Sequence, residues 1–445
     1  MQKIQFFGAV GTVTGSSYFL SDETGKGILV DFGMFQETSE ISQRNRDHLP
    51  LDPNNILGVV VTHAHLDHCG RLPMLVRMGY FGKVYMTEPT KMIAELALMD
   101  AVHIAENNHK EMLYTEENVV QFLRQIEIVE YDQKIDIEQF SITFRDAGHI
   151  MGSAMIEIVA DNTKTVFSGD LGNTPEELVR PTAVIEQADV VVMESTYGDR
   201  IHPQEATNDL IQQEINAVEK SGGTLLVPAF AIDRTQELLH KLNHFKNDGK
   251  IAQDTAVFLD SPMGIQATLI YEHFPQLYND ELSNHAKEEQ PFRFEGLVMV
   301  EHGKESGKIE KIPGTKVIIA GSGMMSGGRI LRHAQKYLPD VTTRLLITGY
   351  QAEGTIGRKI KEGANRVMIE HESVAMNAHV TALEGLSAHA DQPKLLHWIK
   401  QIKGVKKLFI THGEDVARTA LHEKIKEEMQ IESIILPQID ETHEL

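Results

Sequence analysis

The chain has 445 residues, 41% hydrophobic and 24% charged, which suits two globular domains, or one domain with a domain-sized insertion, and excludes an intrinsically disordered protein. The formal net charge of −22 gives the surface as a whole the wrong sign for nucleic acid, so a polyanionic substrate would need a local positive site. The single cysteine, Cys69, excludes an intramolecular disulfide and a four-thiolate zinc site, so any metal must be held by histidine and carboxylate.

Short aliphatic runs, each ending in a polar or glycine-containing turn, recur along the chain and predict buried strands. They are ILGVVVTHAH, TKTVFSGD, ADVVVMEST, GTLLVPAF, TAVFLDSP, TKVIIAGSG, TRLLITGY and VKKLFITHGE. Amphipathic helical patterns lie between several of them, over residues 88–112, 208–220, 234–245 and 391–402. Alternating strands and helices predict an α/β fold, in which loops at strand ends carry the chemistry. The polar segment 278–295 is expected to be a loop or a surface excursion.

The distribution of histidine and aspartate predicts one domain interrupted by another. Residues 1–200 carry most of these side chains at strand ends, and residues 367–445 add two more. Residues 201–366 have strand and helix patterns of their own but no dense histidine cluster. We therefore expect residues 1–200 and 367–445 to form one domain and residues 201–366 to form the insertion.

The sequence has no feature of a membrane or exported protein. The N-terminus lacks the pattern of a secretion signal, and no apolar run is long enough to cross a bilayer. We therefore expect a cytoplasmic protein without a membrane partner.

The stretch THAHLDHCGRLP directly follows a predicted strand and places His63, His65, Asp67 and His68 on one loop. His63 and His65 can point at one ion, while Asp67 and His68 can turn to a second. Imidazole nitrogens with a carboxylate suit Zn²⁺, and Mn²⁺ and Fe²⁺ would also fit. So dense a group is rare by chance in a chain with 21 histidines, which favours a metal site over an inert loop.

Four side chains do not complete two ion sites, so further ligands are expected at other strand ends. The candidates are His149 in DAGHIMGSAM, Asp170 at the end of TKTVFSGD and His412 in LFITHGE. Asp170 is the natural bridge, because a carboxylate can span two cations about 3.5–4 Å apart. Two cations would also lower the pKa of a water molecule and so supply a nucleophile at neutral pH.

Four of these features resemble the motifs of the metallo-β-lactamase fold. They are Asp31 in LVDFG, the HAHLDH loop, His149 and Asp170. The resemblance implies the αββα sandwich of that fold, an α/β architecture.

Three further motifs resemble those of the β-CASP branch, which acts on nucleic acid and carries an inserted α/β β-CASP domain. They contain Glu194 in ESTYGDR, His389 in LSAHAD and His412 in THGE. The strings HAHLDHCGRLP, ESTYG, PAFAIDRTQELL, GMMSGG, GYQAEGT and SAHAD follow one another in this order. They are similar to the endonuclease subunit of the cleavage and polyadenylation specificity factor and its bacterial and archaeal homologues.

The resemblance implies a role for each residue of the site. The implied ligands are His63, His65 and His149 for one zinc ion, Asp67, His68 and His412 for a second, and Asp170 as the bridge. Asp31 would orient a ligand through hydrogen bonds. Catalytic roles fall to His389 as general acid, to Glu194, which holds it in position, and to Asp67.

Together these motifs imply a zinc-dependent ribonuclease acting on single-stranded RNA. RNA is favoured over DNA because RNA-directed members of the branch carry histidine at the position of His412, where DNA-repair members carry valine. An endonuclease is preferred to a 5′ exoribonuclease, since the family's exonucleases usually have a longer C-terminal domain that aids dimerisation. The sequence does not decide between a monomer and a homodimer. A small-molecule metallo-hydrolase would leave the insertion without a task, and a catalytically silent scaffold would be expected to have lost ligands, so both are less favoured.

The segment GSGMMSGGR, residues 321–329, follows a predicted strand and is rich in glycine. Its backbone N–H groups could cradle a phosphate. Ser326, Gly327, Gly328 and Arg329 are therefore candidate RNA contacts, unless the segment is simply a tight structural turn.

Overall fold

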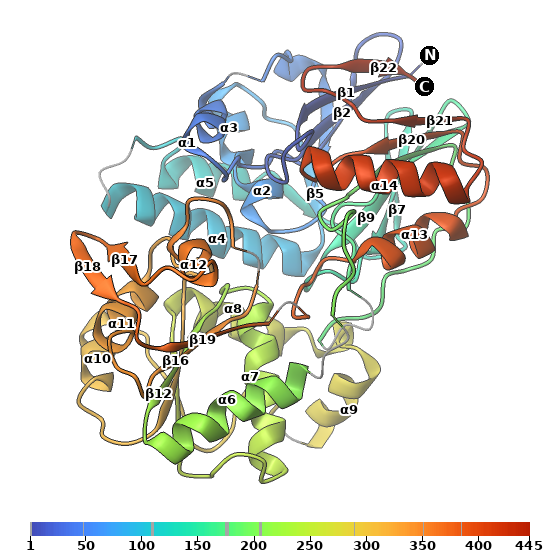
Figure 1. The fold of residues 1–445 in the computed structure, drawn as a ribbon. Coiled ribbons are helices and arrows are strands. Elements are labelled where there is room, and N and C mark those ends of the chain that lie inside the picture. Colours follow the sequence, from blue (N-terminus) through green and yellow to red (C-terminus); the bar gives the residue numbers. More distant parts are fainter. Residues whose placement is uncertain are drawn as a thin grey trace. The chain divides into compact units, whose positions relative to one another are not determined.

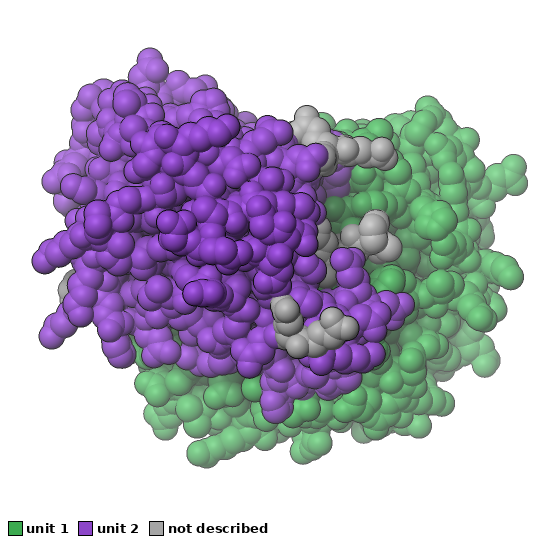
Figure 2. Space-filling view, turned by 90° about the horizontal axis from the view of Figure 1, so that it is seen from below, with its two compact units in different colours: residues 1–201, 388–445 green, residues 202–387 purple. Residues whose placement is uncertain are grey.

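The computed structural model describes residues 2–47, 49–107, 111–173, 178–203, 207–288, 290–349, 351–383 and 385–445 (Figure 1). Tyr350 of the GYQAEGT motif lies outside the described residues. The chain divides into two compact units (Figure 2). Unit 1 comprises residues 1–201 and 388–445, and unit 2 comprises residues 202–387.

Two sheets form the centre of unit 1. Within the described residues, the first has the strand order β22-β1-β2-β3-β4-β5-β6 and the second β21-β20-β11-β10-β9-β8-β7. The first contains β1 (Lys3–Gly8), β2 (Ser17–Ser21), β3 (Gly27–Val30), β4 (Ile56–Val60), β5 (Val84–Met86), β6 (Ile126–Ile128) and β22 (Thr442–Glu444). The second contains β7 (Lys134–Ile137), β8 (Phe140–Asp146), β9 (Ala154–Ala160), β10 (Thr163–Phe167), β11 (Val190–Met193), β20 (Lys407–Ile410) and β21 (Ser433–Ile435).

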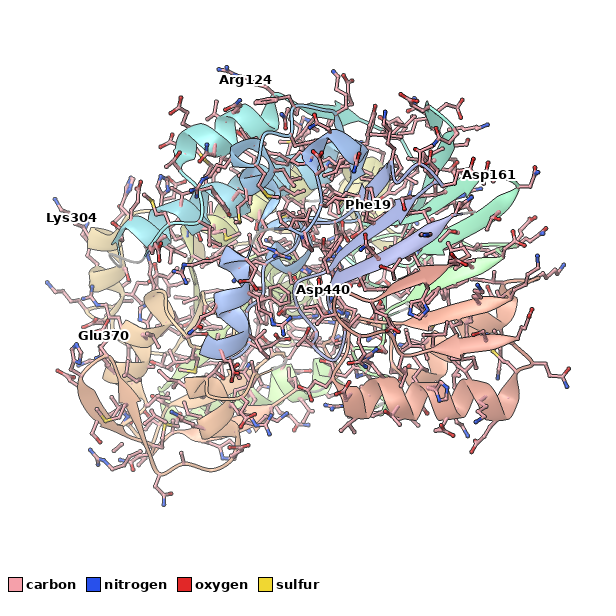
Figure 3. The ribbon with its side chains drawn as sticks, turned by 90° about the horizontal axis from the view of Figure 1, so that it is seen from above. Phe19, Arg124, Asp161, Lys304, Glu370 and Asp440 are labelled. Atoms are coloured by element: carbon pink, nitrogen blue, oxygen red, sulfur yellow. The ribbon has the colours of Figure 1, made fainter. Side chains whose placement is uncertain are left out.

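The two sheets pack face to face through one apolar core. Phe6 and Val60 of the first sheet and Phe144, Phe167 and Phe409 of the second all belong to it and are buried. In Figure 3 the labelled Phe19 of β2 lies inside the unit, whereas Asp161 stands at the outer tip of the turn between β9 and β10. Apolar burial of this kind contributes about 25 cal/mol per Å² and fixes which face of each strand points inward.

Helices cover the outer faces of the sandwich (Figure 1). On the second sheet, Leu395 and Leu421 from two helices pack with Val191 and Ile410. The helices of unit 1 are α1 (Ser39–Gln43), α2 (Leu66–Cys69), α3 (Leu72–Arg77), α4 (Glu88–Asn107), α5 (Glu116–Leu123), α13 (Gln392–Gln401) and α14 (Asp415–Glu428). The implied αββα sandwich is therefore confirmed.

Unit 2 is built on a parallel sheet with the order β14-β13-β15-β12-β16-β19 in the described chain. Its strands are β12 (Thr224–Pro228), β13 (Ala256–Asp260), β14 (Leu297–Met299), β15 (Lys316–Ala320), β16 (Arg344–Ile347) and β19 (His379–Ala382). Its helices are α6 (Thr207–Ser221), α7 (Arg234–Asn247), α8 (Pro262–His273), α9 (Asp280–Glu288), α10 (Gly303–Ile309), α11 (Arg329–Tyr337) and α12 (Ile356–Lys361). In Figure 3, Lys304 of α10 projects outward.

One expectation about this half of the chain was wrong. The second boundary lies at residue 388, not 367, because β19 pairs with β16 and the hairpin of β17 (Arg366–Ile369) and β18 (Glu372–Ala375) belongs to unit 2. Segment 278–295, expected to be a loop or a surface excursion, contains the short helix α9, whose described side chains other than Leu282 are exposed or half-buried. By contrast, each of the eight strand patterns contains an observed strand, and each of the four helical patterns contains an observed helix. None of the helices in the described chain combines the length and apolar character that a bilayer span requires.

Candidate metal centre

The loop after β4 turns at α2 and so divides its polar side chains between two directions. His63 and His68 are buried, while His65 and Asp67 are partly buried. The loop sits tightly against the neighbouring strand end, because a Cβ on Gly33 would lie 1.6 Å from the carbonyl oxygen of Asp67. Any larger residue at position 33 would therefore displace the loop.

The first group of ligand atoms comes from three strand ends. His63 Nε2 lies 3.1 Å from His65 Nδ1, and His149 Nε2 lies 3.2 Å from the same atom. Asp170 Oδ2 completes the group at 3.3 Å from His63 Nε2 and 3.5 Å from His149 Nε2. His63, His149 and Asp170 are at most 1% exposed.

The second group uses the other oxygen of the same carboxylate. Asp170 Oδ1 lies 3.2 Å from His68 Nε2 and 3.3 Å from His412 Nε2, and these two nitrogens are 3.0 Å apart. Asp67 Oδ2 lies 3.5 Å from His412 Nε2. The structure thus brings all seven expected ligands together, with Asp170 between the two groups.

The donor set fits divalent cations. An ion held tetrahedrally at about 2.0–2.1 Å separates its ligand atoms by about 3.3 Å, close to the spacings in both groups. Both carboxylate oxygens of Asp170 are buried, and neither accepts a hydrogen bond from any residue that the structure describes. A buried carboxylate without donors is costly unless a cation compensates it, so these residues form a site for divalent metal.

Burial and charge set the protonation of the histidines. Desolvation lowers the pKa of His63 to about 3 and that of His65 to about 4, and it lowers the pKa of His149 well below its usual value. These rings are therefore neutral at neutral pH, the form that binds metal. Burial also opposes charge on His68, but the carboxylates of Asp170 and Asp31 outweigh it and raise that pKa.

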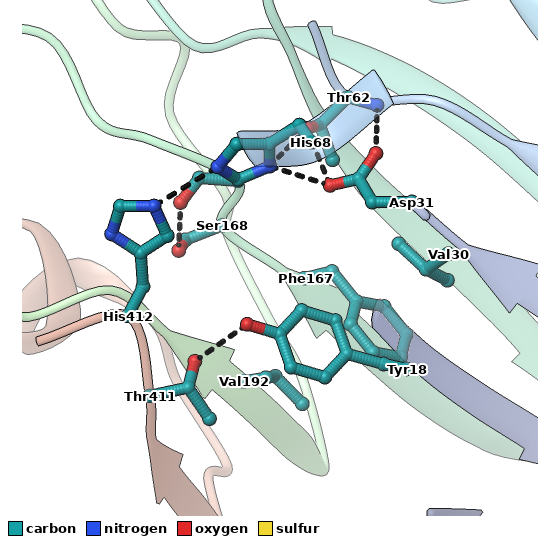
Figure 4. Close-up of a pocket in the computed structure, with 11 residues that line it drawn as sticks. Tyr18, Val30, Asp31, Thr62, His68, Phe167, Ser168, Val192, Thr411 and His412 are labelled. Carbon is teal, nitrogen blue, oxygen red and sulfur yellow. Dashed lines mark hydrogen bonds and ion pairs between the residues drawn. The ribbon is translucent and has the colours of Figure 1, made fainter. Parts of the chain in front are cut away.

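Asp31 fixes the orientation of His68 (Figure 4). Its Oδ2 lies 2.7 Å from His68 Nδ1 and accepts a hydrogen bond from the Thr62 hydroxyl at 2.7 Å. Its Oδ1 accepts the Thr62 backbone N–H, also at 2.7 Å. An N–H on Nδ1 therefore directs the Nε2 lone pair of His68 toward Asp170 and His412.

Glu194 and His389 form a charged pair beside the first group. His389 Nδ1 lies 3.3 Å from Glu194 Oε1, and its Nε2 lies 3.8 Å from Asp170 Oδ2. Glu194 is itself held by backbone N–H groups of Leu171 at 2.6 Å and Thr196 at 3.2 Å. Burial disfavours charge on His389, but Glu194 and then Asp170 outweigh it and raise the pKa to about 9.

The four candidate RNA contacts differ in their surroundings. Ser326 and Gly328 are exposed and Gly327 is half-buried. Arg329 instead binds within unit 2, since its guanidinium donates to Asp260 Oδ1 at 2.7 Å and to the carbonyl oxygens of Val300 and Glu301 at 2.8 and 2.6 Å. Its charge is therefore already matched inside the unit.

Sequence reasoning missed two kinds of residue. Thr62 and Thr196 contact the ring nitrogens of His68 and His412, at 3.2 and 3.0 Å. Thr62 directly precedes the HAHLDH motif and Thr196 lies within ESTYG, and these places were the available signal. It also missed a histidine group in unit 2, formed by His240, His244 and His285. The three are not dense in the sequence, because α9 brings His285 to two histidines spaced four residues apart on α7.

Three family models match the chain in order. The metallo-beta-lactamase superfamily matches residues 10–210, the Beta-Casp domain residues 235–360, and the Zn-dependent metallo-hydrolase RNA specificity domain residues 373–437. The last range contains His389 and His412.

Curated proteins resemble the chain over most of its length. A ribonuclease from Thermus thermophilus is 36% identical over 93% of this chain and 94% of its own. An RNase J-like protein from Methanocaldococcus jannaschii is 32% identical over 88% of each chain. Transcription termination factor FttA from Methanosarcina mazei is 31% identical over 96% of this chain and 69% of its own.

Among solved structures, a protein of unknown function from Enterococcus faecalis has a similar fold. The TM-score is 0.56 over 99% of both chains, at 12% identity.

Proposed function

Because the chain belongs to the β-CASP branch of the metallo-β-lactamase superfamily, we propose that it is a zinc-dependent ribonuclease that cleaves single-stranded RNA internally. The observation that carries the proposal is the pair of ligand groups on the two oxygens of Asp170, with a histidine–glutamate pair beside them. A hydrolase needs no other side chains to activate water and protonate a leaving group.

Zinc is the proposed metal because five histidines and two carboxylates make up the donor set. Their spacings, between 3.0 and 3.5 Å, suit tetrahedral coordination by imidazole nitrogen. Divalent cations bound there supply positive charge for the phosphoryl oxygens and lower the pKa of water. They also supply the local positive site that a chain of net charge −22 needs to accept RNA.

His389 is the proposed general acid. Its Nδ1 faces Glu194, so its Nε2 is directed toward Asp170 and the metal ligands. Its raised pKa keeps a proton on the ring at neutral pH, and that proton passes from Nε2 to the 3′ oxygen that leaves phosphorus. Glu194 acts through this ring, by stabilising its charge and fixing its direction.

RNA is the proposed substrate for three reasons. A family model described as an RNA specificity domain covers residues 373–437, and His412 is the residue that the RNA-directed members of the branch carry. The relative from Thermus thermophilus is named as a ribonuclease.

The test is cleavage of end-labelled single-stranded RNA and of DNA of the same sequence by the zinc-loaded chain. We expect internal products from RNA and little cleavage of DNA. His389→Ala should reduce the rate about 10²–10⁴-fold, the range for loss of a general acid, without changing bound metal.

His397→Ala is the matched control, since this histidine is exposed on α13, eight residues away. Equal rates for His389→Ala and His397→Ala would rule out the assigned acid. Products that shorten only from the 5′ end would indicate 5′ exonuclease activity in place of internal cleavage. Faster cleavage of DNA than of RNA would overturn the assignment of RNA as the substrate.

A further inference from the structure

Three histidines in unit 2 converge outside the catalytic sequence motifs. His240 and His244 lie four residues apart on α7, so they share one helix face, and His285 reaches them from α9. One ring nitrogen of each lies within 4.8 Å of the others. The Nε2 atoms of His240 and His244 are 3.2 Å apart.

The ring arrangement resembles that of the catalytic ligands. The Nε2–Nε2 distance of 3.2 Å falls within the 3.0–3.5 Å range of the two groups around Asp170. The rings of His240 and His244 are nearly perpendicular, at 72°, with centroids 4.4 Å apart. The ring of His285 lies with its centroid 4.6 Å from that of His244 and 5.3 Å from that of His240, so all three rings converge.

His240 is the most deeply buried of the three rings. Burial first, then the neighbouring His244 and His285, and then Lys241 lower the pKa of His240 to about 3, against the opposite influence of the Pro291 carbonyl. The ammonium group of Lys241 interacts with other side chains: its Nζ donates to Asn208 Oδ1 at 2.9 Å and lies 3.5 Å from Glu237 Oε1.

Helix α9 has only a small apolar anchor. Among its side chains that the structure describes, Leu282 alone is fully buried. The chain just after α9 is tied to α7 by Asn243, whose amide donates to the carbonyl oxygens of Gln290 and Pro291 at 3.0 and 3.2 Å. A bond between His285 and the α7 histidines would fix the helix itself.

We propose that His240, His244 and His285 bind a further divalent transition-metal ion, with Zn²⁺ as the fitting ion, and that this ion fastens α9 to α7. Three imidazoles on one tetrahedral ion would leave a fourth position for water. The site is structural and takes no part in cleavage, so this proposal can be tested independently of the ribonuclease proposal.

The test counts zinc in the tag-free, full-length chain after saturation with Zn²⁺ alone and removal of the excess. We expect three ions per chain in the natural sequence and two in the His240→Gln/His244→Gln double variant. The single variant His285→Gln provides a second measurement should the double variant fail to fold, because His285 is only partly buried. His371→Gln is the control, since His371 is exposed in the turn after β17, and it should retain three ions.

A second readout separates this site from the catalytic centre. Co²⁺ bound to three imidazoles absorbs in the visible range, and this band should persist in Asp170→Asn but weaken in His285→Gln. RNA cleavage should be unchanged in His285→Gln. An equal zinc count in His285→Gln and the natural chain would overturn the proposal, whatever the outcome for RNA cleavage.

Discussion

Asp170 determines the chemistry at the scale of single residues. It is 1% exposed, and each of its oxygens faces a different set of ring nitrogens. In the absence of cations its charge would be balanced only by protonated histidines, and His68 and His412 indeed have raised pKa values beside it. Metal binding replaces those protons, so metal affinity should fall as pH falls.

We expect the Glu194–His389 pair to set the pH dependence of cleavage. A general acid must be protonated, so kcat/KM should fall as pH rises through the pKa of His389, which is about 9. Glu194→Gln removes the negative charge that most strongly raises this pKa. We therefore expect the alkaline fall in the pH–rate profile to move to lower pH. If the alkaline fall occurred at the same pH in Glu194→Gln as in the natural chain, the charge of Glu194 would not control the pKa of His389.

Asp31 should act on metal affinity rather than on the proton transfer. Asparagine in its place has a single accepting oxygen, so its NH₂ group must face either the Thr62 backbone N–H or the Thr62 hydroxyl and His68 Nδ1. Loss of such an orienting contact typically weakens metal binding by about 10–100-fold. Competition of Asp31→Asn with a chromophoric chelator for Zn²⁺ measures this directly, and affinity equal to that of the natural chain would contradict the orienting role.

At the scale of elements, the catalytic centre is a set of strand ends. β4, β10, β11 and β20 each end in a loop that carries a site residue, and β10, β11 and β20 are parallel neighbours. Aliphatic runs followed by polar turns are a local pattern, which is why the sequence predicted these strands and the residues after them. The pairing of His285 with His240, and of Arg329 with Asp260, depends on tertiary packing and left no comparable local signal.

The pairing of Arg329 with Asp260, beside the loop before α11, is expected to stabilise unit 2. Arg329 donates to Asp260, which is fully buried and also accepts from Ser306 at 2.5 Å and contacts His333 Nε2 at 2.7 Å. Arg329→Ala would leave part of this buried carboxylate without a donor. The expected loss is about 1.5–3 kcal/mol in the free energy of unfolding, measured by denaturant titration.

Ser326→Ala in the same loop should change that free energy by less than about 0.5 kcal/mol, because its side chain is exposed. Equal stability of the two variants would show that the Arg329 contacts contribute nothing to unit 2. In that case Arg329 would return to the candidates for RNA contact.

At the scale of the whole molecule, the catalytic ligands all belong to one unit although the chain leaves and re-enters it. His389 and His412 follow the long insertion of residues 202–387, and β20 and β21 then complete the second sheet. The interruption itself was predictable from where histidines and aspartates cluster. Its exact end was not, because β17 to β19 look like any other short strands until their partners are known.

We propose that the residues around Asp170 cleave RNA only when they hold metal. The most direct measurement is the initial rate of cleavage of end-labelled RNA as Zn²⁺ is added to chelator-treated protein. The His240→Gln/His244→Gln background confines zinc to the catalytic centre. We expect no cleavage by the metal-free chain and a rise that levels off at two equivalents of zinc. Cleavage by the metal-free chain, or a plateau at one equivalent, would contradict the two-metal centre.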